Sequence, residues 1–327
     1  MTENDPRRSF AAFFAAEIAP ALPALEAQRR DRRRSAVARS FGAAFVVVVL
    51  ALIAGMAWHA FAGGAVLIVG AVLAVVWARL PARRHREAVR ELVVPALLRF
   101  LGGAEYHRKP GKRFDLARFR RSGIAGAFTR AALEDLFLGR YRETDFRLVE
   151  ARLYRQRRTG GSDGGGRERR SVFSGLLCEV SVPVPVEGTV VLLGDRGTRG
   201  DWIAGIVRHH LPAVAPVACD HPALNERYQV FGENLAEAQR LLQPGLCETL
   251  LALADEVEAA GGLNAAFLDG RFLLAIPQRR NLFEVGRLDR SLEFAEEDLR
   301  RLAAEFTIPQ RLIDNLHGER KPLLPEA

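Results

Sequence analysis

The distribution of apolar and charged positions separates a long uncharged segment from the rest of the chain. Residues Phe41 to Ala78 contain no charged side chain, and only His59 and the pair Gly63-Gly64 interrupt the apolar run. A membrane-spanning helix needs about 20 predominantly apolar residues. The segment is therefore too long for one span, and it predicts a transmembrane hairpin of two helices with a short turn at the glycine pair.

Arginines flank this segment on both sides. Basic residues beside short spans are retained in the cytoplasm and attract anionic lipid headgroups, so the flanks predict cytoplasmic termini and an outward-facing turn. A buried helix pair in a soluble protein is the alternative, but such helices are seldom apolar on every face. The flanking arginines are Arg29, Arg30, Arg32, Arg33, Arg34 and Arg39 before the segment, and Arg79, Arg83, Arg84, Arg86 and Arg90 after it.

Small residues recur through both predicted spans, and they predict close packing of the two helices. Before the hairpin, Phe10, Phe13, Phe14 and Ile18 follow helical spacing. This segment predicts a short amphipathic helix that lies either on the inner leaflet or on the soluble domain. After the hairpin, Val89, Val93 and Phe100 belong to a helical stripe that predicts a docking face for the domain. The small residues in the spans are Gly42, Ala51, Gly55, Gly70 and Ala74.

The remainder of the chain has an α+β pattern. A helix is predicted from Ala131 to Leu138, and the Gly-rich segment Thr159 to Gly166 predicts the tip of a long hairpin. Asp269-Gly270 predicts a two-residue turn between two strands. Consecutive strands with short connections favour an antiparallel sheet. Further strands are predicted at Phe146 to Leu153, Val172 to Val180, Thr189 to Leu193, Ala213 to Ala218 and Tyr228 to Phe231, and further helices at Gly245 to Ala259, at Phe294 to Phe306 and after Pro309.

The predicted organisation has three parts: a cytoplasmic, Arg-rich N-terminal segment at residues 1–40, the transmembrane hairpin at 41–80, and a cytoplasmic α+β domain at 81–327. The fold class is α+β, with the two-helix hairpin followed by a mainly antiparallel sheet domain with flanking helices. The formal charge of +8 does not predict a nucleic-acid partner, because much of the excess lies beside the membrane and no aromatic platform for bases accompanies it. The three cysteines are odd in number and widely spaced, so they predict no disulfide framework.

Three groups of residues invite a chemical interpretation. Gly194 to Gly200 follows an apolar strand and has the glycines of a phosphate loop, but its spacing is that of neither a P-loop nor a dinucleotide fingerprint, which favours a plain loop. Glu134 and Asp135 could act as an acid–base pair, but neighbours on a helix point about 100° apart, which favours surface charge. The metal-capable residues lack the tight pairing of a zinc site, which favours loop histidines; they are His209, His210, Cys219 and His221. The sequence therefore predicts no catalytic, cofactor or metal residue and no cofactor.

An ordered set of short motifs resembles the bacterial family called domain of unknown function 3137, over most of residues 90 to 315. At Asn234 to Leu241 the chain departs from the family pattern. Members are uncharacterised, sometimes labelled galanin, and often encoded near LemA-type membrane proteins. The resemblance implies architecture and a LemA-type partner, but no catalytic residues. The motifs are Tyr106, Ser122-Gly123, Leu133 to Gly139, Thr144, Phe146, Glu150, Val172 to Leu177, Glu187 to Val191, Asp220 to Phe231 and Asn281 to Glu284.

Two functions remain open from the sequence. The preferred one is a non-enzymatic protein of the bacterial inner membrane whose cytoplasmic domain binds protein partners or organises an envelope complex. The alternative is a membrane-tethered enzyme that acts on a phosphorylated or lipid-derived substrate, with the Gly194 to Gly200 loop as part of its pocket.

Overall fold

The computed structural model describes residues 12–57, 60–100, 104–158, 167–194, 198–256, 262–278 and 295–317. By its internal contacts the chain divides into two compact units. One contains the two long N-terminal helices and the beginning of helix α9 (Ala295–Leu316), and the other contains the sheet and the part of α9 that begins at Glu305. The predicted division at residues 40 and 80 is finer than this and stays a prediction.

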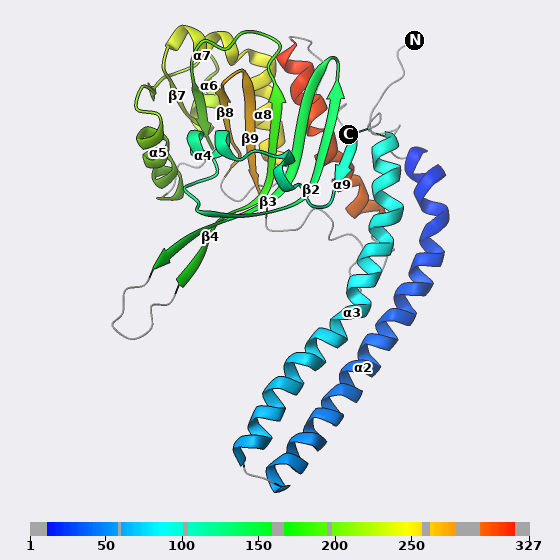
Figure 1. Ribbon diagram of the computed structural model, residues 1–327. Helices are drawn as coiled ribbons and strands as arrows, with labels where there is room; N and C mark the ends of the chain where they lie inside the picture. Colours follow the sequence, from blue (N-terminus) through cyan, green and yellow to red (C-terminus); the bar gives the residue numbers. More distant parts are fainter. Residues whose placement is uncertain are drawn as a thin grey trace. The chain divides into compact units, whose positions relative to one another are not determined.

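Two long helices form the first unit. Helix α2 (Leu22–Ala57) and helix α3 (Ala60–Phe100) lie side by side (Figure 1). A Cβ atom added at Gly70 would lie 2.9 Å from the Val47 side chain. This glycine therefore permits the close approach of the two helices that the small residues predict.

The described part of the chain contains one helical segment, Phe14–Ala54, that is long and apolar enough to cross a membrane. Only 6% of its apolar window is buried, whereas the core helix of a soluble protein is mostly buried. Large side chains of α2 stand exposed, among them Phe41 at 75% and Met56 at 89%. The structure thus supports an N-terminal apolar helix, which is one of the two spans that the sequence predicts.

The chain before α2 forms a short π-helical turn, η1 (Phe14–Ile18), and a 3₁₀ turn, η2 (Ala19–Ala21). Phe14 and Ile18 are buried, and η1 contacts α3. The sequence placed this segment on either the inner leaflet or the soluble domain. In the structure it packs on α3, with Glu17 Oε2 2.8 Å from Arg99 Nη2, in the part of α3 that the sequence assigned to the domain at 81–327, so the second alternative is favoured. Phe10, which belongs to the same predicted face, lies outside the described residues.

A nine-stranded antiparallel sheet forms the centre of the second unit. Its strand order is β1-β2-β3-β4-β9-β8-β5-β7-β6. The strands are β1 (Glu105–His107), β2 (Arg130–Tyr141), β3 (Thr144–Arg158), β4 (Arg167–Ser181), β5 (Val190–Leu193), β6 (Ala215–Pro216), β7 (Gln229–Gly232), β8 (Asn264–Leu268) and β9 (Arg271–Pro277).

Helices cover both faces of this sheet (Figure 1). On one face, Phe119 and Val207 pack with sheet residues such as Val149 and Leu273 in one apolar core. On the other face, Phe137 of β2 meets Phe306 of α9 with ring centroids 4.3 Å apart. The helices are α4 (Ala117–Ser122), α5 (Thr198–His210), α6 (Pro222–Arg227), α7 (Leu235–Leu241), α8 (Pro244–Glu256) and α9, with a 3₁₀ turn, η3 (Gly111–Arg113).

Most of the predicted strands are confirmed. Strands β3 and β4 pair in antiparallel register up to Arg158 and Arg167, so they form the predicted long hairpin, although its tip at 159–166 lies outside the described residues. Asp269 and Gly270 both adopt positive φ, 50° and 68°, as the primed hairpin turns require. The α8 helix and the strands β5, β6 and β7 also lie where the sequence predicted them.

One predicted helix is wrong, and the prediction of two helices at the end of the chain is wrong in part. Residues 131–138 belong to strand β2, because pairing with β1 and β3 on both sides overrides the local preference of Ala, Leu and Glu for helix. The predicted break at Pro309 is also absent, since α9 continues through Pro309 to Leu316. Its later part carries the buried residues Ile308, Leu312 and Ile313, whose packing favours one continuous helix.

Candidate functional site

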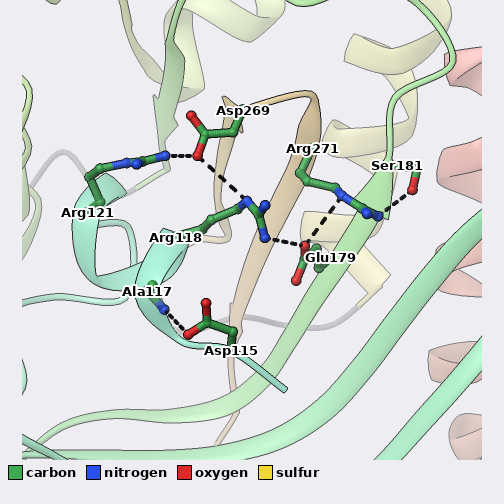
Figure 2. Close-up of polar contacts among 8 residues, drawn as sticks. All are labelled: Asp115, Ala117, Arg118, Arg121, Glu179, Ser181, Asp269 and Arg271. Carbon is green, nitrogen blue, oxygen red and sulfur yellow. Dashed lines mark hydrogen bonds and ion pairs between the residues drawn. The ribbon is translucent and has the colours of Figure 1, made fainter. Parts of the chain in front are cut away.

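A network of ion pairs joins helix α4 to the sheet (Figure 2). The short helix ends at Gly123, whose φ of 71° forms a left-handed cap, and Phe119 anchors it in the core. These features direct the two arginines of α4 toward the sheet. The charged members of the network are Arg118 and Arg121 of α4, Glu179 of β4, Asp269 of the β8–β9 turn and Arg271 of β9.

Glu179 is the buried centre of this network. Its side chain is 1% exposed, and its Oε1 accepts a hydrogen bond from Arg118 Nη1 at 3.1 Å. Arg271 Nε lies 3.6 Å from the same oxygen, while Arg271 Nη1 donates to Ser181 Oγ. Because a buried carboxylate is costly without partners, the two guanidiniums compensate the charge of Glu179.

Asp269 forms the outer part of the network. Its Oδ2 accepts a hydrogen bond from Arg121 and lies 3.7 Å from Arg118 Nε. All of these side chains except Glu179 are partly exposed, so their ion pairs are weaker than a fully buried pair. The network therefore reaches from a buried carboxylate to the surface.

Two buried atoms of the network have no hydrogen-bond partner among the described residues. These are Glu179 Oε2 and Arg118 Nε. Three guanidiniums face two carboxylates, which leaves one positive charge in excess. The arrangement can fix α4 to the sheet, and its chemistry also suits a ligand that carries an anionic group and a hydrogen-bond donor.

A second carboxylate site lies on the other face of the sheet, under α9. Glu305 Oε1 accepts a hydrogen bond from Gln278 Nε2 at 2.9 Å. Burial and the nearby Glu150 raise the pKa of Glu305 to about 7, and the Gln278 hydrogen bond opposes them. Arg152 Nη2 lies 3.4 Å from Glu150 Oε1. A carboxyl group that binds its proton near neutral pH therefore holds α9 to the sheet.

Residues 171–317 match the family described as "Protein of unknown function (DUF3137)". The chain carries a DUF3137 domain. The match begins within β4, so the motifs from Tyr106 to Glu150 in the predicted resemblance precede it. The match includes Glu179, Asp269, Arg271 and Glu305, whereas Arg118 and Arg121 lie outside it.

No curated protein matches the chain. One similar solved structure is the crystal structure of the mycobacterial trehalose monomycolate transport factor A, TtfA, which is 12% identical over 68% of this chain and 91% of that chain. The TM-score of this match is 0.33.

Glu134 and Asp135 are the carboxylates predicted to lie on a helix surface, and the structure gives them different environments. Both belong to β2, where the pairing with β3 shifts at a bulge between Glu134 and Phe137. Glu134 is exposed, but Asp135 is 1% exposed, has a φ of 53° and accepts a hydrogen bond from Tyr106 Oη at 2.6 Å. The prediction of surface charge is therefore wrong for Asp135, because the bulge turns its side chain inward.

The metal-capable residues have separate structural roles. His209 and His210 lie at the end of α5 rather than in a loop, and His210 Nδ1 lies 2.8 Å from the carbonyl oxygen of Arg120. His221 caps α6 of the DUF3137 domain by accepting from the backbone N–H of Leu224. The thiol of Cys219 donates to Asn225 Oδ1. In the described ranges, no group of three or more His, Cys, Asp or Glu side chains is placed to hold a metal ion.

The Gly194 to Gly200 loop is described only at its ends, since residues 195–197 lie outside the described part. The backbone N–H of Gly194 donates to Asn264 Oδ1 at 3.1 Å. A Cβ atom at Gly194 would lie 2.5 Å from the carbonyl oxygen of Leu263, so the close approach of two backbones requires glycine here. This packing accounts for the first glycine of the motif without any ligand.

The sequence did not identify the network around Glu179. Its available signal was a single carboxylate inside an apolar strand, with Cys178 and Val180 as neighbours. Its arginine partners come from other segments and have no motif in common.

Proposed function

We propose that this protein is anchored in the bacterial inner membrane and presents its α+β domain to the cytoplasm as a protein-interaction or scaffold module in envelope organisation. The observation that carries the proposal is the exposure of large apolar side chains along α2. Soluble monomers rarely expose contiguous apolar surface of this kind, because it is unfavourable in water. A bilayer removes that cost. The exposed residues of α2 include Phe41, Phe45, Leu52, Ile53 and Met56.

The proposed anchor is a hairpin in which the apolar parts of α2 and α3 both cross the bilayer. On α3, Ile68, Val72 and Leu73 are exposed in the same way. The close contact between Gly70 and Val47 is typical of helices that pack within lipid. Because arginines flank both helices, both termini are placed in the cytoplasm.

A cleaved signal sequence is the other explanation for one apolar helix near an N-terminus. The apolar region of a signal peptide is about 7–15 residues long, whereas α2 runs from Leu22 to Ala57 and packs along α3. Arg39 of α2 also lies over the ring of Trp77 of α3, 5.2 Å from its centroid. These contacts favour a retained anchor.

The ion pairs around Glu179 support a non-enzymatic role of the domain. In the network around Glu179 the described charged groups bind one another, which is typical of a structural element. The family resemblance makes a LemA-type membrane protein a partner to test. Lipid is the second partner, through the arginines beside the spans.

The alternative of a membrane-tethered enzyme is favoured by one specific observation. The buried Glu179 Oε2 lacks a hydrogen-bond partner among the described residues and lies beside arginines that could hold a phosphoryl group. In that case Glu179 would contact the bound substrate. Its replacement would then reduce function by more than its effect on folding explains.

Two experiments test the proposal. Membranes that contain the full-length protein are extracted at alkaline pH, and the protein is expected in the pellet; release into the supernatant would refute the anchor. The protein is then purified in mild detergent with its partners. A Glu179→Gln variant that melts like the parent and keeps its partners, yet behaves in the cell like a deletion, would favour the enzyme.

A further inference from the structure

Strands β3 and β4 continue beyond the rest of the sheet as a two-stranded ribbon (Figure 1). Strand β2 stops pairing with β3 at Tyr154, and β9 pairs with β4 only from Gly175 onward. Residues 155–158 and 167–170 therefore pair only with each other among the described strands. We call these eight residues the Arg ribbon.

The Arg ribbon carries a large net positive charge. Its sequence contains six arginines and one glutamate, Glu168. In the register of the two strands, Arg155 lies opposite Arg170, and Arg158 lies opposite Arg167. Like charges directly opposite each other destabilise a strand pair. A bound polyanion would reduce this repulsion between the arginines.

The exposed arginines of the ribbon are free to bind such a partner. Arg155, Arg169 and Arg170 are exposed, and no carboxylate in the described part of the chain pairs with them. Arg169 lies over the ring of Tyr154, with its guanidinium carbon 3.5 Å from the ring centroid. This contact holds one guanidinium in place and covers the aromatic face that could otherwise stack on a base.

We propose that the Arg ribbon docks on the anionic phosphate headgroups of the membrane in which the chain is anchored. The inference rests on the proposed membrane anchor. From Ala78 at the end of the apolar segment, α3 continues for 22 residues to Phe100, which corresponds to a length of about 33 Å. This tether keeps the domain at a high effective concentration near headgroups, so weak individual contacts suffice.

The chemistry of the ribbon suits phosphate. The guanidinium group binds phosphate through two parallel hydrogen bonds. Each basic residue near an anionic surface increases partitioning on the order of fivefold, so three guanidiniums correspond to about a hundredfold. A basic two-stranded ribbon can also enter the major groove of DNA. The membrane is favoured here because the anchor supplies a phosphate surface to the same chain and because the Tyr154 ring is covered.

The test uses the full-length protein in lipid nanodiscs. A fluorophore is attached at Ser171→Cys, an exposed position beside the ribbon, because the three native cysteines are buried. Some lipids carry a nitroxide quencher on the headgroup. We expect strong quenching in discs of phosphatidylcholine with phosphatidylglycerol, little in phosphatidylcholine alone, and loss of quenching at high salt.

Three triple variants separate the contribution of the ribbon from that of positive charge in general. The ribbon variant R155Q/R169Q/R170Q is expected to lose about a hundredfold in the bound-to-free ratio of the label in anionic discs. The control K109Q/K112Q/R113Q removes the same charge from three exposed positions outside the ribbon and is expected to quench like the parent. A third variant, R155K/R169K/R170K, retains the charge and is expected to keep most of the quenching.

Three outcomes would overturn the inference. The first is equal quenching in the two lipid compositions, and the second is equal loss in the ribbon and control variants. The third is an absence of quenching together with tight binding of a DNA duplex that the ribbon variant loses, which would assign the ribbon to nucleic acid. Failure of the anchor itself is recognised separately, because the protein would not enter the discs.

Discussion

The raised pKa of Glu305 predicts how the stability of the domain depends on pH where α9 packs on the sheet. Its carboxyl group has a pKa of about 7 in the folded protein, compared with an ordinary value of 4.5, chiefly because of burial and also because of Glu150. The folded state therefore binds this proton more tightly than the unfolded state. The stabilisation is fully present below pH 4.5 and is lost as the pH rises through about 7. Over that window the shift corresponds to about 3 kcal/mol of unfolding free energy.

The variant Glu305→Gln mimics the protonated side chain and cannot ionise. We expect it to match the parent near pH 4.5 and to exceed it by up to about 3 kcal/mol above pH 7. Glu256→Gln is the control, since it also removes a carboxylate that contacts α9, through a partly exposed pair with Arg311 at 2.7 Å. Such a pair is worth at most about 1 kcal/mol.

Unfolding can be followed in the full-length protein in detergent through its buried thiols. Burial raises the pKa of Cys247 to about 12 and raises that of Cys178 further, so both react with a maleimide pulse only when the domain opens. Urea midpoints from pH 4.5 to 8 are compared between parent and variant at each pH, which cancels the pH dependence of the labelling chemistry. Parallel curves across the whole range would refute the raised pKa and the burial that causes it.

Three further predictions concern packing, ion pairs and topology. Gly175→Ala places a Cβ atom 2.0 Å from the carbonyl oxygen of Ile276, so it should destabilise the domain by about 1–3 kcal/mol in urea unfolding, whereas Gly205→Ala has open space on α5 and should be neutral or stabilising; equal effects would show that β4 and β9 are not packed this closely. Glu179→Ala removes the buried carboxylate that pairs with the partly exposed Arg118 and Arg271 and should cost about 1–3 kcal/mol. Arg121→Ala removes a half-exposed partner of Asp269 and should cost no more than about 1 kcal/mol; a smaller loss for Glu179 than for Arg121 would contradict the burial of Glu179. Reporter fusions at the N-terminus and after residue 100 should both give cytoplasmic signals, because arginines flank both helices; a periplasmic signal at either end would exclude the hairpin.

The sequence predicts the sheet well wherever a strand is defined by local chemistry. Asp269-Gly270 specifies a primed turn, and the structure has positive φ at both positions. The apolar run from Thr189 to Leu193 becomes β5, whose four residues are all buried. In each case the local pattern and the tertiary environment favour the same element, so the prediction succeeds.

The prediction fails where the tertiary environment overrides the local pattern. The segment from Ala131 to Leu138 has good helix formers, but it lies between β1 and β3 and forms part of a long strand. Asp135 could not be predicted as a buried residue, because only the bulge in β2 gives it a positive φ and brings it to the hydroxyl of Tyr106. A single sequence carries no signal for that irregularity.

The network around Glu179 shows which part of a buried ion pair a sequence can specify. A carboxylate between Cys178 and Val180, inside a strand buried on both faces, must have cationic partners or lose its charge. That requirement indicates that Glu179 has a partner or is protonated, but it does not specify an arginine. The identity of the arginine depends on the fold, because Arg118 lies 61 positions away on helix α4, which packs on the sheet in which β4, β9 and β8 are neighbours. The need for a partner is therefore a local property, whereas the choice of partner, and with it any binding chemistry at this site, is set by long-range packing.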